Sequence, residues 1–295
     1  MDDQQLEKIR EGKGFIAALD QSGGSTPDAL AAYGIGHDAY SSDQEMFDLM
    51  QSMRSRIALS PAFDGDHILG AILFEDSVGR DVGGLPFADY LWSTKRIVPF
   101  LKIDRGLAPV SDGVQLMKPI PDLDALLSLG LKKRVFGTKM RSFIRLADEK
   151  GIEAITDQQF AVARQILDVG LVPILEPEIS IESPEKGAAE GLLKSAILER
   201  LGGLAPGQLV MVKLTLPEID DFYTELVHHP SILRVLALSG GYTREAADAR
   251  LAKNHRVIAS FSRALTNGLR ETQDDAAFNA TLSASINGIF EASLT

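Results

Sequence analysis

The stretch LVMVKLTL, residues 209–216, places one lysine inside an otherwise apolar β-strand pattern. Side chains alternate between the two faces of a strand. The even-numbered valines and leucines would therefore share one apolar face, and Met211 and Lys213 would share the other. A charged amine in a buried strand costs free energy unless it is paired or neutralised. We therefore expect a functional reason for Lys213; the alternative is a long side chain that reaches solvent at the strand end.

Seven further apolar, β-branched runs recur along the chain, with amphipathic, helix-like stretches between them. They cover residues 15–20, 68–74, 97–104, 134–141, 172–179, 232–240 and 256–263. Strands that alternate with helices indicate βαβ units and a parallel sheet. Eight such units predict an α/β fold, the (β/α)8 TIM barrel, as a single domain over residues 1–295.

A doubly wound open sheet is the structural alternative. That fold would normally place a glycine-rich nucleotide-binding turn after an early strand. The turn DQSGGS, residues 20–25, matches neither the dinucleotide nor the P-loop pattern. The barrel is therefore the favoured architecture.

The composition excludes several classes of function. The 30 basic and 41 acidic residues give a net charge of −11, which argues against nucleic-acid and anionic-membrane partners. The chain has no cysteine, so disulfides and thiolate chemistry are excluded. It starts without an apolar signal segment, and no apolar run approaches a membrane span. We expect a cytoplasmic protein.

Ionisable residues gather at the carboxyl ends of five of the predicted strands, always on one face. They are Asp20, Lys102, Asp104, Lys139, Arg141, Glu176, Glu178 and Lys213. The carboxyl ends of the strands form the catalytic face of a TIM barrel. One such residue alone would be read as a structural ion pair, but several charges at one end indicate a ligand site.

A lysine in this setting can act as a nucleophile once its pKa is lowered. Lys213 and Lys139 would face each other across the barrel end, and each would favour the neutral amine in the other. A neutral amine attacks a ketone to give a carbinolamine, which loses water to form an imine. Glu176, on the strand between them, is placed to supply the proton.

Three turns have the composition of phosphate sites. LSGG, residues 238–241, leads into a helix-like stretch, and FSR, residues 261–263, offers Arg263. Loops after the seventh and eighth strands are the usual phosphate site of a barrel. DQSGGS, with Lys102 nearby, could hold a second phosphate.

No metal or cofactor site is expected. The five histidines form neither an H-x-H nor an H-E-x-x-H pattern. Glu176 and Glu178 could bind Mg²⁺ in principle, but lysine-rich surroundings disfavour a hard cation.

Eight motifs follow one another in the order found in a known family. They are GKGFIAALDQSGGS (12–25), AILFEDS (71–77), LKID (101–104), TKMR (138–141), VPILEPEI (172–179), VKL (212–214), LSGG (238–241) and FSRAL (261–265). On the basis of these eight motifs, the chain resembles the class I fructose-bisphosphate aldolases, the metal-independent Schiff-base type. That family is a TIM barrel, in agreement with the strand pattern.

The resemblance implies a role for each candidate residue. Lys213 would be the Schiff-base lysine, Glu176 the acid and base, and Lys139 the lysine that tunes charge. Asp20 would assist proton transfer near the scissile bond, and Glu178 would support the network. The phosphate on the ketone half would be bound by Ser239, Gly240, Gly241, Ser260 and Arg263. The other phosphate and the hydroxyls would be bound by Ser22, Ser25, Lys102 and Arg141.

The implied reaction is reversible cleavage of fructose 1,6-bisphosphate to dihydroxyacetone phosphate and glyceraldehyde 3-phosphate, in glycolysis and gluconeogenesis. The alternatives are a Schiff-base enzyme for another ketose phosphate, such as tagatose bisphosphate or a transaldolase substrate, and a non-catalytic sugar-phosphate-binding barrel. Homo-oligomers are common in the family, so a homo-oligomer is expected.

Overall fold

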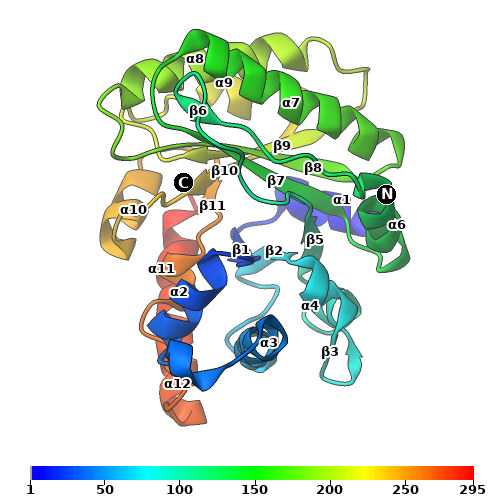
Figure 1. Cartoon of the computed structure of the whole chain (residues 1–295), viewed down its shortest axis with the longest axis vertical. Coiled ribbons are helices and arrows are strands. Elements are labelled where there is room, and N and C mark those ends of the chain that lie inside the picture. Colours follow the sequence, from blue (N-terminus) through cyan, green and yellow to red (C-terminus); the bar gives the residue numbers. More distant parts are fainter. Residues whose placement is uncertain (1) are drawn as a thin grey trace.

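Eight parallel strands form a nearly closed barrel in the computed structural model, which describes residues 2–295 (Figure 1). In spatial order they are β1 (Phe15–Leu19), β2 (Ile68–Leu73), β5 (Val98–Lys102), β7 (Gly137–Ile144), β8 (Val172–Ile179), β9 (Val210–Thr215), β10 (Ile232–Leu238) and β11 (Val257–Ala259). The first and last strands meet where the Ala18 N–H donates to the Phe261 carbonyl, at 3.4 Å. The TIM-barrel prediction is confirmed.

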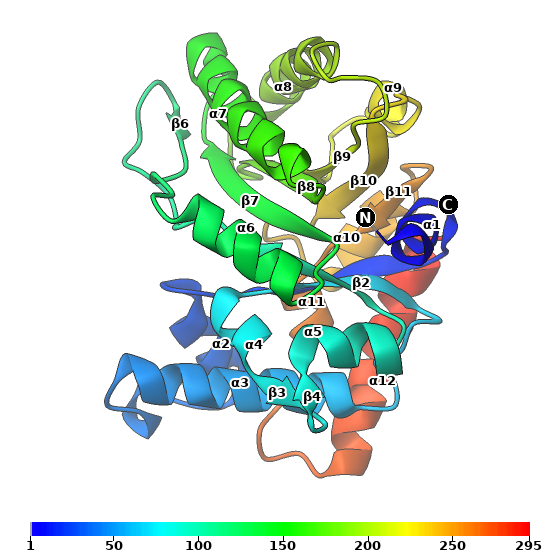
Figure 2. The same cartoon turned by 90° about the vertical axis from the view of Figure 1, so that its right-hand side faces the viewer.

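Helices surround the strands, and Figure 2 shows α7 and α8 on the side opposite α3 and α12. The helices are α1 (Asp3–Glu11), α2 (Ser25–Tyr33), α3 (Asp43–Leu59), α4 (Glu75–Gly79), α5 (Phe87–Asp89), α6 (Leu123–Lys132), α7 (Glu149–Asp168), α8 (Lys186–Leu201), α9 (Thr224–Val227), α10 (Arg244–Leu251), α11 (Arg263–Thr266) and α12 (Asp275–Ala292). The remaining elements are the 3₁₀ helix η1 (His37–Ala39), the π-helix η2 (Tyr90–Thr94) and the short strands β3 (Asp81–Val82), β4 (Leu85–Pro86) and β6 (Val114–Gln115). None of these helices combines the length and apolar character that crossing a membrane requires.

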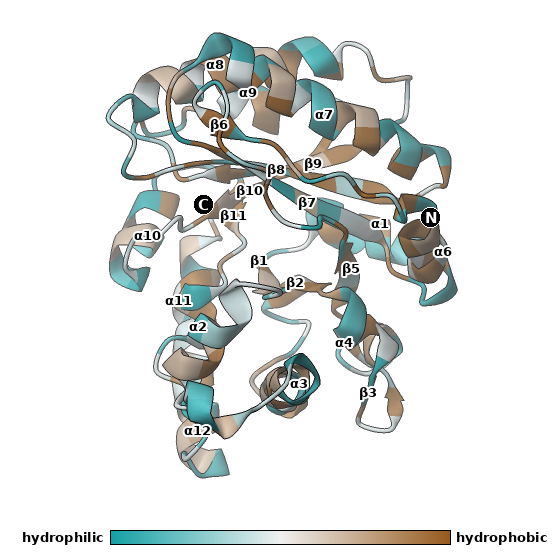
Figure 3. Cartoon of the chain, in the orientation of Figure 1, coloured by the Kyte–Doolittle hydropathy of each residue, from teal (hydrophilic) through white to brown (hydrophobic). Residues whose placement is uncertain are grey.

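The core has two parts, one on each face of the strands. Figure 3 shows the hydrophobic residues along β2, β5 and β9. Val210, Val212 and Leu214 of β9 pack with the outer helices, whereas Met211 belongs to the separate interior cluster with Ile174 of β8. Ile9 of α1 joins the interior cluster. Strand alternation therefore sorts side chains as expected, and Lys213 shares the interior face with Met211.

Two predicted strands begin later in the chain than the sequence pattern suggests. The strand expected at 134–141 is Gly137–Ile144, and that expected at 256–263 is only Val257–Ala259. Arg134 and Arg256 have positive φ angles of 54° and 63°, which an extended strand cannot contain. In both cases the strand starts after this left-handed residue.

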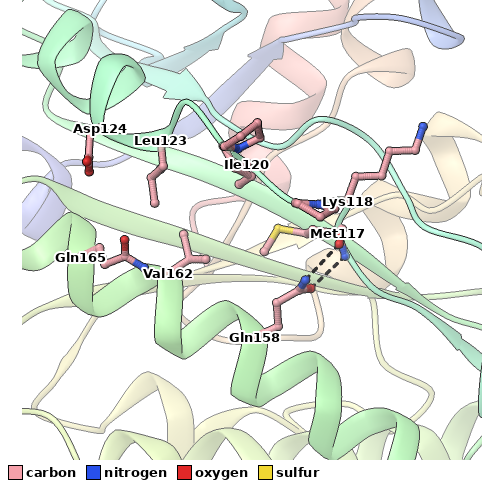
Figure 4. Close-up of a pocket in the computed structure, with 10 residues that line it drawn as sticks. Met117, Lys118, Ile120, Leu123, Asp124, Gln158, Val162 and Gln165 are labelled. Carbon is pink, nitrogen blue, oxygen red and sulfur yellow. Dashed lines mark hydrogen bonds between the residues drawn. The ribbon is translucent and has the colours of Figure 1, made fainter.

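A long connection after β5 is fixed to the outer helix α7. The side-chain amide of Gln158 donates to the Met117 carbonyl at 2.9 Å and accepts from its N–H at 2.8 Å (Figure 4). This pair satisfies both main-chain groups of Met117, as a neighbouring strand would. The residues that follow Lys102 are thereby fixed on the outside of the barrel.

We expect Gly137→Ala to destabilise the barrel, because a Cβ at Gly137 would lie 2.0 Å from the Val172 carbonyl oxygen of β8. Overpacking of this kind costs about 1–3 kcal/mol or more. Gly191→Ala in α8 is the control, since a Cβ there meets no atom within 4 Å. Urea unfolding measures both free energies, and equal stability of the two variants would contradict this packing argument.

Candidate active site

Four buried charged side chains meet at the carboxyl end of the barrel. Lys213 of β9, Glu176 of β8, Lys139 of β7 and Asp20, directly after β1, are each at most 8% exposed. Lys213 Nζ lies 2.9 Å from Glu176 Oε1, and Lys139 Nζ lies 2.6 Å from Glu176 Oε2. Lys139 Nζ also donates to Asp20 Oδ2, at 2.8 Å. We call these four residues the charge quartet; it contains two amines and two carboxyl groups.

The contact between Glu176 and Lys213 lies where the hydrogen-bonded pairing of β8 and β9 is interrupted. β8 and β9 are paired at Ile174 with Met211 and at Leu175 with Val212. Beyond the ladder, the Thr215 hydroxyl accepts from the Ile179 N–H at 2.8 Å and donates to the Ile179 carbonyl at 2.7 Å. Glu176 and Lys213 lie between the last ladder pair and this bridge. Their side chains point to the interior face by strand alternation.

The electrostatics of the quartet differ from the expected mutual neutralisation of two lysines. Burial lowers the pKa of Lys139, but the charges of Asp20 and Glu176 outweigh burial and raise that pKa above its ordinary value. The expectation that Lys139 is often neutral is therefore wrong. Its amine lies against two carboxylates instead of only facing another cation, so Lys139 stays charged.

The two carboxyl groups are held in their ionised form. Burial raises the pKa of Asp20, but Lys139, Lys213 and Lys102 outweigh burial and lower it well below its ordinary value. The pKa of Glu176 is also lowered, because Lys139 and Lys213 outweigh the opposing effect of burial. Glu176 is therefore an ionised carboxylate in direct contact with the Lys213 amine.

A second group of candidate residues surrounds the quartet. Arg141 Nε lies 2.5 Å from Glu178 Oε2, and Lys102 Nζ donates to the Ser22 hydroxyl at 2.7 Å. Ser25 is exposed at the start of α2, where its hydroxyl donates to the Ser22 carbonyl at 3.1 Å. The structure thus brings Lys102, at the end of β5, together with Ser22 and Ser25, which follow β1.

The turn after β10 has the geometry of an anion site. Gly240 and Gly241 have φ angles of 59° and 125°, which favour glycine. A Cβ at Gly240 would lie 2.7 Å from Ile181 Cγ2, and one at Gly241 would lie 3.7 Å from Arg263 Nη2. The positive φ angles and the close packing of Ile181 therefore favour glycine at both positions, and Arg263 lies beside the turn that starts at the buried Ser239.

Two residues near this turn differ from expectation. Arg263 does not end the eighth strand but begins α11, since β11 stops at Ala259. Ser260 is 1% exposed, and its hydroxyl has no hydrogen-bond partner within the described chain. The Ser260 side chain therefore faces the protein interior in this structure.

The Mg²⁺ alternative finds no support in the geometry. Glu176 is in contact with Lys139 and Lys213, and Glu178 with Arg141. Between residues 2 and 295, no group of three His, Cys, Asp or Glu side chains is arranged to hold a metal ion.

The sequence analysis assigned no role to four residues that lie around the site. Asp104 was assigned to the same strand face as Lys102, and its carboxylate lies 3.5 Å from the Lys102 amine. Gln21 and Ser262 are joined by a 2.7 Å hydrogen bond between the loops after β1 and β11. Arg54 of α3 donates to the Gln21 carbonyl. Helical spacing offered a signal for Arg54, which falls between Met50, Met53 and Ile57 on the buried face.

Three curated relatives cover nearly the whole chain. All are named class 1 fructose-bisphosphate aldolase: one from Synechocystis is 59% identical over 292 residues, covering 99% of this chain and 97% of the relative. Those from Porphyromonas gingivalis and Clostridium acetobutylicum are each 53% identical, over the full length of both chains. The chain belongs to the class 1 fructose-bisphosphate aldolase family.

Two solved structures support the fold of the family. Fructose-bisphosphate aldolase from Plasmodium falciparum matches with a TM-score of 0.77 at 19% identity, covering 98% of this chain and 93% of that one. A protein from Corynebacterium glutamicum matches with a TM-score of 0.56 at 14% identity, covering 99% and 92%. No protein-family model matches the chain.

We expect Lys139→Met to lower the free energy of unfolding at pH 7 by about 3–5 kcal/mol, because it leaves two buried carboxylates short of a cation. Carboxyl groups with lowered pKa stabilise the fold above their ordinary pKa of about 4 and lose that contribution as the pH falls. The wild type keeps most of this contribution at pH 4, because the pKa values of Asp20 and Glu176 are lowered. In the variant the loss of Lys139 lets burial raise these pKa values, so the two carboxyl groups bind protons as the pH falls from 7 to 4 and the deficit should shrink.

Urea unfolding at pH 7 and pH 4 measures this deficit. Lys150→Met is the control, because Lys150 is 81% exposed in its pair with Asp112. Exposed pairs contribute about 0–1 kcal/mol, so the control should change little at either pH. Two results would contradict the assignment of Lys139 as the cation that stabilises Asp20 and Glu176. One is a loss of unfolding free energy in Lys139→Met as small as that in the control, and the other is an equal loss at both pH values.

Proposed function

We propose that this chain cleaves fructose 1,6-bisphosphate reversibly into dihydroxyacetone phosphate and glyceraldehyde 3-phosphate through an imine on Lys213. The observation that carries the proposal is the 2.9 Å contact between the Lys213 amine and Glu176 within the buried quartet. Curated relatives that are 53–59% identical and named for this substrate support it.

Imine formation uses the ionised carboxylate of Glu176. Glu176 takes a proton from the Lys213 ammonium, and the neutral amine attacks C2 of the open-chain sugar. A proton moves from nitrogen to oxygen to give the carbinolamine. The protonated Glu176 then gives its proton to the C2 hydroxyl, which leaves as water. The product is a protonated imine, and Glu176 is again a carboxylate.

The protonated imine then accepts the electrons of the C3–C4 bond. A carboxylate, of Glu176 or of Asp20, takes the proton of the C4 hydroxyl. The C3–C4 bond breaks, and glyceraldehyde 3-phosphate leaves. The electrons of the broken C3–C4 bond stay on the dihydroxyacetone phosphate half and form an enamine on Lys213. Protonation at C3 and addition of water to the imine release dihydroxyacetone phosphate and restore the lysine.

Lys139 has an electrostatic role in this scheme. Its charged amine contacts both Asp20 and Glu176, so it holds the two carboxylates ionised and in place between proton transfers. A fixed cation stabilises the negative charge that returns to Glu176 after each proton is given away. Lys139 therefore tunes the charge of the carboxylates, and Glu178 with Arg141 supports the edge of the network.

Two groups of donors would bind the two phosphates of the substrate. The Ser239-Gly240-Gly241 turn and Arg263 would bind the phosphate on the ketone half, with Ser260 behind them. Lys102, Ser22 and Ser25, together with Arg141, would bind the other phosphate and the hydroxyls. Local donors of this kind let a protein with a net charge of −11 bind a sugar bisphosphate.

The setting of the reaction is part of the proposal. The chain would act as a single domain over residues 1–295, assemble into a homo-oligomer, and work in the cytoplasm on a sugar phosphate of glycolysis and gluconeogenesis. Its acidic charge supports the absence of a nucleic-acid partner.

We expect Lys213→Met to abolish cleavage of fructose 1,6-bisphosphate while circular dichroism shows an intact fold, because methionine fills the space of the lysine without an amine. Borohydride reduction with dihydroxyacetone phosphate in EDTA, followed by peptide mass mapping, should place the adduct on Lys213 in the wild type. Lys118→Met, at an exposed position, is the control and should keep both properties. Normal turnover by Lys213→Met, or an adduct on another lysine, would refute the assignment.

A further inference from the structure

Arg54 of α3 is a buried cation that forms no ion pair within the described chain. Its side chain is among the largest that are fully buried, with 1% exposure. One guanidinium nitrogen donates to the Gln21 carbonyl, and another donates to the Ser77 hydroxyl at 2.7 Å. Its Nε has no hydrogen-bond partner in residues 2–295. The fixed contacts of this charge are therefore to neutral oxygens only.

Such a group is costly to bury. Burial lowers the pKa of Arg54 to about 10, opposed by the charges of Asp20 and Asp76 at longer range. A buried charge without a direct partner destabilises a protein by several kcal/mol. An apolar side chain of similar volume would fill the same space in α3 without this cost. The hydrogen bonds to the Gln21 carbonyl and the Ser77 hydroxyl are what an apolar side chain could not reproduce, and of these two only Gln21 is a chain neighbour of proposed site residues.

Gln21 lies where the two sides of the proposed substrate site meet. In the chain it stands between Asp20 of the charge quartet and Ser22, whose hydroxyl accepts from Lys102 at 2.7 Å. Its side-chain amide donates to the Ser262 hydroxyl at 2.7 Å, and Ser262 precedes Arg263. Fixing the Gln21 main chain therefore fixes Asp20 on one side and Ser22 on the other.

We propose that Arg54 is a positioning residue for cleavage of the carbon–carbon bond. It touches no substrate; it holds the loop after β1 so that Asp20 and Ser22 keep their places. This inference rests on the roles proposed above for these two residues. Lys213 and Glu176 are held by β8 and β9, and within the described chain no hydrogen bond or ion pair joins either of them directly to this loop. Arg54 is therefore needed for cleavage of the bisphosphate more than for imine formation.

The test compares two reactions in the full-length Arg54→Met and Arg54→Lys variants. One is cleavage of fructose 1,6-bisphosphate, resolved into kcat and KM. The other is the borohydride-trapped adduct of Lys213 with dihydroxyacetone phosphate. We expect Arg54→Met to lose about 10²-fold in kcat/KM for cleavage, as a displacement of about 1 Å can cause, and to form the adduct as the wild type does. Arg54→Lys should lose less, since its ammonium can still donate to the Gln21 carbonyl.

Arg56→Met is the matched control. Arg56 lies on the same helix and also donates to main-chain carbonyls, those of Glu271 and Gln273, but these lie in the segment before α12. The control should lower the melting temperature and leave kcat/KM for cleavage unchanged. This contrast separates positioning from general stability.

Three results would overturn the inference. One is wild-type kcat/KM for cleavage in folded Arg54→Met; if that variant does not fold, the same result in Arg54→Lys decides. Another is equal loss of cleavage and adduct formation in proportion to the unfolded fraction, as a purely structural residue would give. Absence of a Lys213 adduct in the wild type is distinguishable from both, because it would overturn the proposed function itself and Arg54's role with it.

Discussion

The structure of the site depends on one carboxylate held between two amines. Glu176 lies 2.6 Å from Lys139 and 2.9 Å from Lys213, in a region where burial alone would favour its neutral form. Lys139 is bound by Asp20 as well, so its charge is fixed. Lys213 has Glu176 as its only ion-pair partner within the described residues. This asymmetry distinguishes the two lysines: Lys139 contacts two carboxylates, and Lys213 contacts one.

The barrel makes this arrangement possible because the strands that carry Lys139, Glu176 and Lys213 are neighbours in the sheet. β7, β8 and β9 are adjacent and parallel, so side chains at the same end and on the same face come together. The apolar interior beneath them, with Met211 and Ile174, keeps water from the inner side of the quartet. Where the β8 and β9 ladder is interrupted, the Thr215 bridge to Ile179 takes over its hydrogen bonds. Three members of the quartet are thus placed on the strands, and the loops that follow β1 and β10 carry Asp20 and the glycine turn.

Strand alternation predicted most of this from sequence. The recurring apolar runs identified the eight strands, and alternation identified the interior face of β9 and the residues that meet at the carboxyl end of the barrel. It did not predict the charge state of Lys139, because that depends on which carboxylates lie within 3 Å across three strands. The sequence pattern misplaced the starts of β7 and β11. A residue with a positive φ angle, such as Arg134, cannot be recognised from the order of apolar and polar residues. Arg54 was visible as a charge on an apolar helical face, but its partner Gln21 lies 33 positions away in the chain.

The central claim is that Glu176 exchanges the proton that turns Lys213 from an ammonium into a nucleophile and back. Loss of ¹⁸O from C2-labelled dihydroxyacetone phosphate reports imine formation and hydrolysis without any carbon–carbon bond change. The account predicts that Glu176→Gln, which keeps the shape but cannot carry the proton, slows this exchange by about 10²–10⁴-fold in a folded protein. Exchange at the wild-type rate in Glu176→Gln would contradict the account.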